Sequence, residues 1–328
     1  MKARALEFAG PRTIEMVDVE VPDPGPGQAL VRTDYSGISG GTEMLAYRGE
    51  LPPDLPLDER IGSLTGTFSY PFRYGYSCVG TVEHPIALEG ALVFAFHPHQ
   101  DIFVVEGSDS VPLGDMDPRL GTLFPQVETA LQVALEAGPL QDRTVAVVGL
   151  GAVGVLTSLL LLRGGARVVA SELDPLRREV AISLGVSAHA PEELPEAVEK
   201  ETGGHGVPVV VEASGDPAAL AESLPLLERE GTALVASWYG AKEAVLPLGA
   251  EFHRRRLTIR STQVSTIPAR LAGRWTVSRR RAVARRLMDE LPLPRLATHE
   301  FPFKDAASAF EAIDRGEQGL VHAAMWYR

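Results

Sequence analysis

The chain has 328 residues, of which 45% are hydrophobic and 23% are charged, and its formal net charge is −12. This balance is typical of a globular protein long enough for two hydrophobic cores, and it excludes a largely disordered chain. The negative charge argues against general nucleic-acid binding, which depends on basic contacts to phosphates. The single cysteine, Cys78, excludes an internal disulfide and a metal site made of four cysteines.

The N-terminal residues MKARALEFAGPR contain no apolar stretch of the kind that a secretory signal needs, so we expect a cytoplasmic protein. The uncharged run from Thr144 to Leu162 has about the length of a bilayer span. Three glycines break its first half, however, and it begins with β-branched residues. We therefore predict a buried strand, a turn and a helix here, and no membrane association.

Short apolar segments separated by Pro/Gly turns fill the first third of the chain. This pattern predicts an antiparallel, barrel-like β domain, with strands over residues 2–9, 13–21, 28–37, 77–84, 91–96 and 101–107.

From residue 125 onward, helical and strand-like segments alternate, which is typical of a parallel, doubly wound sheet. Helices are expected over 125–137, 154–162, 175–185 and 217–230, and strands over 145–149, 167–171, 207–215, 232–237 and 257–264. After Pro268 we expect an arginine-rich helix, a strand over 298–303, a helix over 305–316 and a last strand over 321–327.

A glycine-rich turn follows the first strand of the alternating region. Residues 145–154 read VAVVGLGAVG, so a β-branched strand runs into Gly149-x-Gly151-x-x-Gly154. The first glycine permits a tight turn, the second lets the backbone approach a pyrophosphate, and the third allows close helix–strand packing. Glu172 follows at about the 20-residue spacing of the carboxylate that bonds the adenosine ribose. We predict a dinucleotide-binding site.

The chain as a whole resembles the medium-chain dehydrogenase/reductase family, the zinc-alcohol-dehydrogenase-like oxidoreductases. The resemblance rests on GISGGTEMLAYRGE (37–50), YGYSCVGTVE (74–83), GLGAVG (149–154), GGHGVPVVVEASG (203–215) and the closing FKDAASAFEAIDRGEQGLVHAAM. The combination of SGISGGTE, YGYSCVG, FAFHPHQD, SWYG and FHRRRLTIRSTQ is most similar to the subgroup that contains bacteriochlorophyllide a dehydrogenase. The resemblance implies an α/β protein with a GroES-like β-barrel catalytic domain over 1–122 and 266–328, and a Rossmann cofactor domain over 123–265. It also implies a small-molecule substrate and a homodimer.

Zinc-dependent members of the family bind the metal through a cysteine, a histidine, and a third cysteine or glutamate. By resemblance, these positions here hold Ser39 or Gly40, Tyr76 and Phe124, none of which is a usual zinc ligand. Leu45 replaces the family's relay histidine. We therefore predict a zinc-free enzyme. A metal held by His97 and His99 together with Glu128 or another side chain stays open as an alternative.

Without a metal, a side chain has to handle the alcohol proton during hydride transfer. The resemblance implies four polar residues along the active-site cleft. Tyr76 and His97 are expected to share the acid–base work, Thr42 to relay the proton, and Glu128 to orient the reactants. Each of them is alternatively a buried hydrogen-bonding residue with no catalytic part.

The cofactor is expected to be NAD, because the carboxylate of Glu172 would repel the 2′-phosphate of NADP. Arg177 and Arg178 follow closely, so NADP binding stays open. By family position, Val153 contacts the pyrophosphate side, and the nicotinamide half is expected to lie along Ala213, Ser237, Trp238, Ser261 and Gln263.

We predict hydride transfer between nicotinamide and a secondary alcohol or ketone of a fairly large substrate. Two other functions stay open. One is reduction of an activated C=C bond, which needs only a hydrogen bond at the carbonyl, and the other is dinucleotide binding without catalysis. Eleven arginines and no acid lie from Arg254 to Arg286. That segment either receives an anionic substrate or forms an exposed helix paired with acidic surface.

Overall fold

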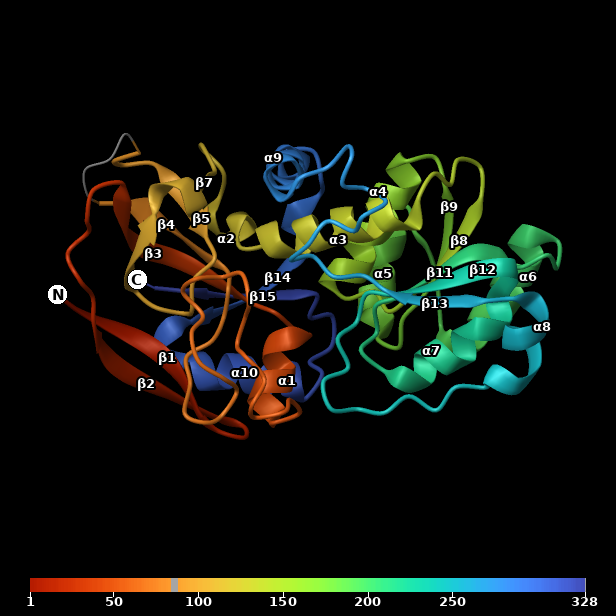
Figure 1. The fold of residues 1–328 in the computed structure, drawn as a ribbon, viewed down its shortest axis with the longest axis horizontal. Coiled ribbons are helices and arrows are strands. Elements are labelled where there is room, and N and C mark those ends of the chain that lie inside the picture. The colour runs from red at the N-terminus through yellow and green to blue at the C-terminus, as the bar shows by residue number, and fades with distance from the viewer. Residues whose placement is uncertain (84–87, 328) are drawn as a thin grey trace. The chain divides into compact units, whose positions relative to one another are not determined.

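The computed structural model describes residues 1–83 and 88–327, and the chain divides into two compact units. The first unit comprises Met1–Pro125 and Arg285–Arg328, and the second unit comprises Gln126–Ala284. Figure 1 shows that the ends of the chain belong to one unit and its middle to the other. The second unit continues to Ala284, past the boundary expected at residue 265, because Arg270 and Arg280 bond to Glu136 and Glu128 of the same unit.

The first unit holds a seven-stranded sheet and a separate hairpin. The sheet has the order β14-β15-β3-β4-β5-β7, and β6 pairs with β3. Its strands are β3 (Gln28–Ile38), β4 (Cys78–Val82), β5 (Leu92–Ala95), β6 (Ile102–Glu106), β7 (Val111–Pro112), β14 (Ala297–Pro302) and β15 (His322–Trp326). The hairpin pairs β1 (Lys2–Gly10) with β2 (Thr13–Glu20). The strands expected in this region are confirmed, apart from His84, which lies outside the described residues.

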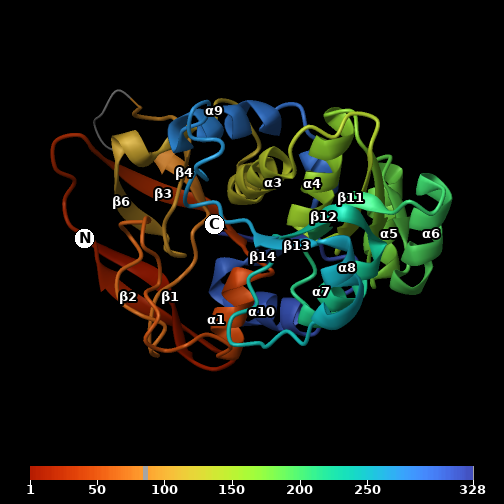
Figure 2. The ribbon, with the colours of Figure 1, turned by 45° about the vertical axis from the view of Figure 1, so that its right-hand side comes forward.

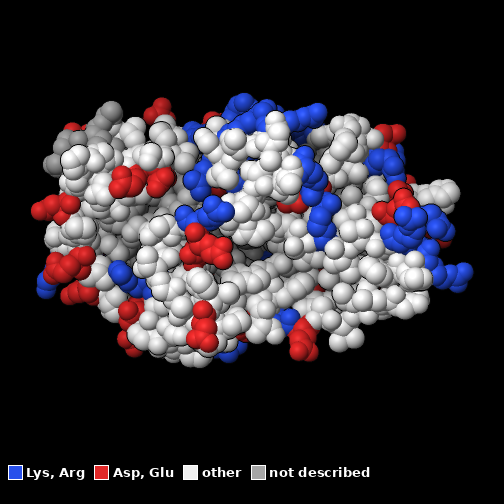
Figure 3. Space-filling model, viewed as in Figure 1, with Lys and Arg blue, Asp and Glu red and all other residues white. Residues whose placement is uncertain are grey.

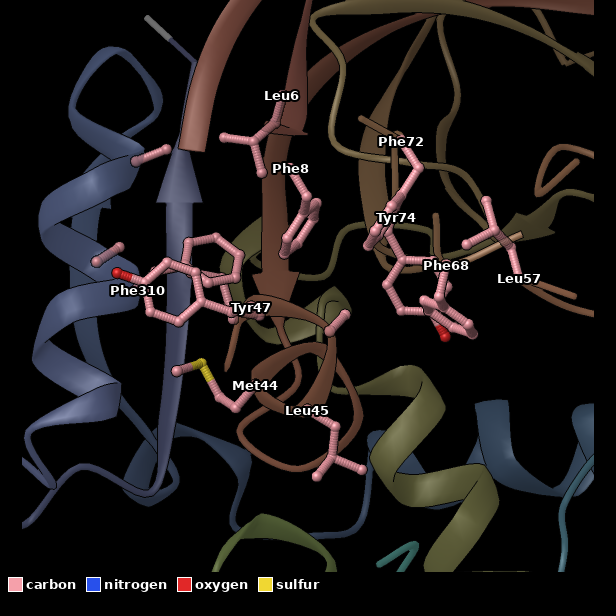
Figure 4. Close-up of a cluster of buried hydrophobic side chains, with 14 of the residues drawn as sticks. Leu6, Phe8, Met44, Leu45, Tyr47, Leu57, Phe68, Phe72, Tyr74 and Phe310 are labelled. Carbon is pink, nitrogen blue, oxygen red and sulfur yellow. The ribbon is translucent and has the colours of Figure 1, made fainter. Parts of the chain in front are cut away.

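An aromatic core fills the space between β1, the loop that follows Leu51, and two helices, α1 (Thr42–Arg48) and α10 (Ala306–Asp314). In this core Phe8 stacks on Phe72 and meets Phe310 edge-on (Figure 4). Leu45 is 4% exposed and belongs to the same cluster. The residue at the relay-histidine position is therefore a core side chain. The short helix α2 (Pro118–Gly121) completes this unit.

The second unit is a six-stranded parallel sheet with helices on both faces (Figures 1 and 2). The strand order is β10-β9-β8-β11-β12-β13, which is the doubly wound order with a crossover between β8 and β11. The strands are β8 (Thr144–Val148), β9 (Arg167–Ser171), β10 (Ser187–His189), β11 (Val207–Glu212), β12 (Leu227–Val235) and β13 (Thr258–Ser261). All five residues of β8 are buried, as the uncharged run required.

The helices of this part of the chain are α3 (Phe124–Ala137), α4 (Ala152–Arg163), α5 (Pro175–Ser183), α6 (Leu194–Thr202), α7 (Pro217–Ser223), α8 (His253–Arg255) and α9 (Val277–Met288). None of the helices in the described residues is long and apolar enough to cross a membrane.

One expected helix, 217–230, is wrong in its second half. The helix α7 ends at Ser223, and β12 begins at Leu227. Pro225 lacks the amide that would continue the helix. The residues after it pair instead with β11, where Val207 lies opposite Leu227.

Candidate active site

The residues expected to bind the cofactor follow the carboxyl ends of the parallel strands. Gly149 follows β8, Glu172 follows β9, and Ala213 follows β11. Ser237 and Trp238 come just after β12, and Ser261 ends β13, with Gln263 two residues beyond it. Because the carboxyl ends of parallel strands meet at one edge of a sheet, the fold gathers residues that are distant in the sequence. Ligands of doubly wound folds bind at this edge, outside the point where the strand order reverses.

The three glycines of the turn have different surroundings. A Cβ on Gly149, whose φ is +91°, would lie 2.6 Å from the Cα of Ser214, and a Cβ on Gly154 would lie 1.9 Å from the carbonyl oxygen of Gly149. A Cβ on Gly151 would meet no atom within 4 Å. The first and third glycines are therefore required by the protein's own packing. The second faces open space at the N-terminus of α4, where Val153 lies and where unpaired helix amides attract phosphates.

Glu172 is 8% exposed, and its carboxylate faces the glycine turn. Its Oε2 accepts a hydrogen bond of 2.8 Å from the amide of Leu150, and its Oε1 accepts one of 3.0 Å from the amide of Asp174. Arg177 lies 3.9 Å from Oε1, while the guanidinium of Arg178 donates to the carbonyl oxygen of Glu172. The acid is thus held by backbone donors beside the turn that it is expected to serve.

Sequence reasoning missed Glu212, which is fully buried at the end of β11. Its Oε1 accepts hydrogen bonds of 2.6 Å from the amide and from the hydroxyl of Ser214, and its Oε2 accepts one of 2.6 Å from the hydroxyl of Tyr239. Burial and the contact with Glu212 raise the pKa of Tyr239. The amide of Gly215 donates to the Oγ of Ser237 at 2.9 Å. Glu212 and Ser237 thereby tie the turn after β11 to the loop after β12. The feature of the sequence that could have identified Glu212 is an acidic residue at the end of an apolar strand.

Glu128 lies on α3 and is 3% exposed. Its Oε1 accepts hydrogen bonds of 3.1 Å and 2.9 Å from Nε and Nη2 of Arg280, which is itself 1% exposed. Arg280 also donates to Oε1 of Gln132 at 2.6 Å and to the carbonyl oxygen of Val264. The expected orienting residue is therefore the partner of a buried arginine within the second unit.

The same face of α3 carries Glu136 two turns further on. Its carboxylate accepts hydrogen bonds of 2.7 Å from the hydroxyl of Thr262 and 2.6 Å from Arg270. Glu136 bonds Thr262, and Arg280, the partner of Glu128, bonds Val264. Residues on α3 therefore hold the segment that includes Ser261 and Gln263, two of the expected nicotinamide contacts. Part of the arginine-rich segment therefore forms ion pairs with α3, so this segment is not a wholly exposed helix. Positive charge also gathers on the surface over α9, as Figure 3 shows.

Tyr76 and Thr42 come together in the first unit. Tyr76 is half-buried, and the side chains of Ser39 and Thr42 lie near its hydroxyl, where they favour the ionised form. Burial raises the pKa of Tyr76 to about 12, and the charge of Glu43 acts in the same direction. At neutral pH this phenol is a hydrogen-bond donor.

A buried polar network that sequence reasoning missed lies beside Tyr76. His99 and Glu43 are both 0% exposed, with His99 Nε2 2.7 Å from Oε2 of Glu43. His99 Nδ1 lies 2.8 Å from the hydroxyl of Ser36, which lies 2.9 Å from the hydroxyl of Tyr327. The amide of Ser39 donates to Oε1 of Glu43 at 3.0 Å. Both ring nitrogens of His99 are thus engaged within the protein.

His97 does not join this group. Its ring stacks on Phe103 with the centroids 4.1 Å apart, and its Nδ1 lies 2.9 Å from the carbonyl oxygen of Pro98. Burial lowers the pKa of His97 to about 4. The residue lines a hollow of about 540 Å³ within the first unit, together with Arg73 and Gln100. Tyr76 and Thr42 are not among the residues that line this hollow.

The residues at the family's zinc positions do not fit the metal. Phe124 and Phe94 are fully buried and pack with their ring centroids 4.6 Å apart, and Phe96 lies 6.2 Å from Phe124. Aromatic carbon therefore occupies the third position, and Tyr76 the second. Over residues 1–83 and 88–327, no three His, Cys, Asp or Glu side chains are grouped so as to hold a metal ion.

Comparison with known proteins gives a consistent picture. Residues 152–276 match a family described as zinc-binding dehydrogenase. The chain is 27% identical to 5-exo-hydroxycamphor dehydrogenase from Pseudomonas putida over 96% of both chains. It is 25% identical to 2-desacetyl-2-hydroxyethyl bacteriochlorophyllide A dehydrogenase from Cereibacter sphaeroides over 94% of both. The crystal structure of 2R,3R-butanediol dehydrogenase from Bacillus subtilis shares its fold, with a TM-score of 0.80 and 20% identity, covering 99% of this chain and 100% of that one.

Proposed function

The chain belongs to the zinc-alcohol-dehydrogenase-like medium-chain dehydrogenase/reductase family, and we propose that it transfers hydride between NAD and a secondary alcohol or ketone of a fairly large substrate, without zinc. The observation that carries this proposal is the shared edge of the parallel sheet, where the glycine turn, Glu172 and the ends of β11, β12 and β13 meet. The nicotinamide supplies or accepts the hydride when it is bound. The chain's own residues hold the cofactor and manage the proton.

Cofactor binding follows from the surroundings of the turn. The open space at Gly151 admits a pyrophosphate to the first amides of α4, beside Val153. Glu172 accepts hydrogen bonds from the ribose hydroxyls and repels a 2′-phosphate. The nicotinamide half is assigned to the loops after the last three strands, through Ala213, Ser237, Trp238, Ser261 and Gln263.

Cofactor choice is tested by titrating the protein with NADH and with NADPH. We expect NADH to bind at least about tenfold tighter, which corresponds to about 1.4 kcal/mol. Glu172→Ser should narrow that ratio, because it removes the negative charge that opposes the 2′-phosphate. Glu179→Ser changes an exposed acid on α5 and should leave the ratio unchanged. Equal affinity of the parent protein for both cofactors would refute the choice of NAD.

Proton transfer is assigned to Tyr76. Its hydroxyl, which lies near the side chains of Ser39 and Thr42, donates a proton to the carbonyl oxygen in reduction and accepts it back in oxidation. The proposal keeps His97 as a second acid–base group and Glu128 as the orienting residue.

The acid–base roles are tested by Tyr76→Phe and His97→Gln. Tyr76→Phe should lower kcat about 100-fold or more while NADH affinity stays unchanged, because general acid catalysis contributes on that order. Tyr35→Phe removes a hydroxyl that bonds Glu300 and serves as the matched control. Unchanged rates in both variants would remove these roles. Assays with paired secondary alcohols, ketones and enones distinguish carbonyl chemistry from C=C reduction.

We propose a reaction without zinc because Tyr76 and Phe124 occupy positions where zinc ligands would be needed. Elemental analysis of protein purified without chelators should find no stoichiometric transition metal. Full activity after dialysis against a chelator is the matching kinetic result. Stoichiometric zinc whose removal abolishes turnover would contradict the proposal.

The proposal includes a cytoplasmic homodimer, which is the assembly implied by the family. Light scattering of the purified protein should give twice the chain mass of 35.2 kDa. A monomer at micromolar concentration would refute the homodimer and leave the rest of the proposal unaffected.

A further inference from the structure

We propose that Glu43 and His99 form a buried dyad that positions Tyr76 for proton transfer. The inference rests on the function proposed for Tyr76, but it concerns residues to which no role has yet been given. Neither side chain touches solvent, and the His99 ring lies edge-on to Phe310 with the centroids 6.3 Å apart. An ionisable pair kept at such a place needs an explanation, because burying charge is costly.

The dyad is fully satisfied by hydrogen bonds. Glu43 uses Oε2 for His99 and Oε1 for the amide of Ser39, while His99 uses Nδ1 for the hydroxyl of Ser36. A neutral imidazole meets all these bonds at once, since Nε2–H donates to the carboxylate and Nδ1 accepts from Ser36. Networks in which each member is satisfied are rigid, so the atoms bonded to this dyad are held in place.

The atoms held in place lie on two sides of Tyr76. On the hydroxyl side, Glu43 accepts a hydrogen bond from the amide of Ser39, and the side chains of Ser39 and Thr42 lie near that of Tyr76. On the backbone side, His99 packs on Gly75, the residue before Tyr76. A Cβ on Gly75 would lie 2.6 Å from Cδ2 and Nε2 of His99, and the φ of Gly75 is +109°.

The dyad therefore contacts both the main chain that carries Tyr76 and the turn that lies near its hydroxyl. Acid catalysis depends on such placement, since the donor has to lie within hydrogen-bond reach of the oxygen that it serves. A misplacement of about 1 Å costs on the order of 100-fold in rate. The negative charge of Glu43 also disfavours ionisation of the phenol, which raises the pKa of Tyr76 and keeps it a donor.

The test uses variants that keep the volume of each side chain. Glu43→Gln removes the charge and one of the two acceptors, and His99→Leu removes both bonds of the ring. His99→Gln restores a donor toward Glu43 and should recover part of the loss. Tyr327→Phe is the matched control, because it removes the far end of the same network but leaves the bonds between Glu43, His99 and Ser39 intact.

We expect Glu43→Gln and His99→Leu to lower kcat about 10- to 100-fold, with the KM for substrate and the affinity for NADH changed less than about threefold. Tyr327→Phe should leave kcat unchanged. If Tyr327→Phe lowers kcat as much as His99→Leu does, the network is merely structural and the positioning role is overturned. Unchanged kcat in folded Glu43→Gln overturns it as well.

A second readout does not need turnover. In protein labelled at the ζ-carbon of tyrosine, Tyr76→Phe identifies the Tyr76 resonance, which reports the hydrogen bonds of its hydroxyl. That resonance should move in Glu43→Gln and His99→Leu and stay fixed in Tyr327→Phe. A fixed resonance in both dyad variants overturns the proposal. If the resonance shifts in the dyad variants but the parent protein has no dehydrogenase activity, the proposed function fails, while the conclusion that the dyad positions Tyr76 remains valid. If His99→Leu does not fold, Glu43→Gln decides by the same measurements.

Discussion

Replacing Arg280 by methionine should destabilise the second unit strongly. Arg280 and Glu128 are 1% and 3% exposed, and their closest contact is 2.9 Å. Methionine keeps most of the arginine's length but leaves the Glu128 carboxylate buried without its main counter-charge. Gln132 and the carbonyl oxygen of Val264 lose a donor as well.

Breaking a buried ion pair on one side costs about 3–5 kcal/mol. Each neutral acceptor left without its donor adds on the order of 1 kcal/mol. Arg281 reduces the total, since its Nε lies 3.5 Å from the same carboxylate oxygen. We therefore expect a loss of about 3–5 kcal/mol, which is a shift of about 1–2 M in the urea midpoint.

The assay is urea unfolding followed by tryptophan fluorescence in a Trp326→Phe background. Trp238 and Trp275 then report the second unit alone, since Trp326 is the one tryptophan of the first unit. Arg256→Met is the matched control, because Arg256 pairs with Glu230 on the surface, where both side chains are well exposed. An exposed pair of this kind contributes at most about 1 kcal/mol.

The double variant Glu128→Gln/Arg280→Met should be more stable than Arg280→Met alone, because it removes the stranded charge. If Arg280→Met costs no more than Arg256→Met, the buried pair does not tie α3 to the segment after β13.

Two further predictions concern the glycine turn and a buried histidine. Gly151→Ala should weaken NADH binding without lowering the melting temperature. Gly154→Ala should lower both the affinity for NADH and the melting temperature, because its Cβ would lie 1.9 Å from the carbonyl oxygen of Gly149. Equal melting temperatures of the two variants in calorimetry would contradict this prediction. His322 is 2% exposed, and burial lowers its pKa from 6.5 to about 4. The unfolded chain therefore binds a proton that the folded chain does not between these values, so stability present above pH 6.5 is lost by about 3 kcal/mol as the pH falls to 4. His322→Gln should flatten that part of the stability profile, and an unchanged acid limb would exclude His322 as its source.

Much of the fold was determined by patterns of short range. The β-branched run before Gly149 and the uncharged helix after it predicted β8 and α4, because strand, turn and helix follow from neighbouring residues. The alternation that continues to Ser261 predicted a parallel sheet, and the sheet in turn implied one common edge for residues spread over more than a hundred positions. The error at 224–230 arose because pairing with β11, which is not local, competed with the helical pattern.

The side-chain partners inside the first unit were not visible in the sequence. Ser36 and Tyr327 are 291 residues apart, and Glu43 and His99 are 56 apart, with no common spacing to connect them. Glu128 and Arg280 are likewise separated by 152 residues. Backbone hydrogen bonds and side-chain periodicity act between near neighbours, so the sequence by itself determined the strands, the helices and the glycine turn. Only the packing of distant segments decided which buried acid meets which base, because a buried charge requires a partner in space but none at any fixed distance along the chain.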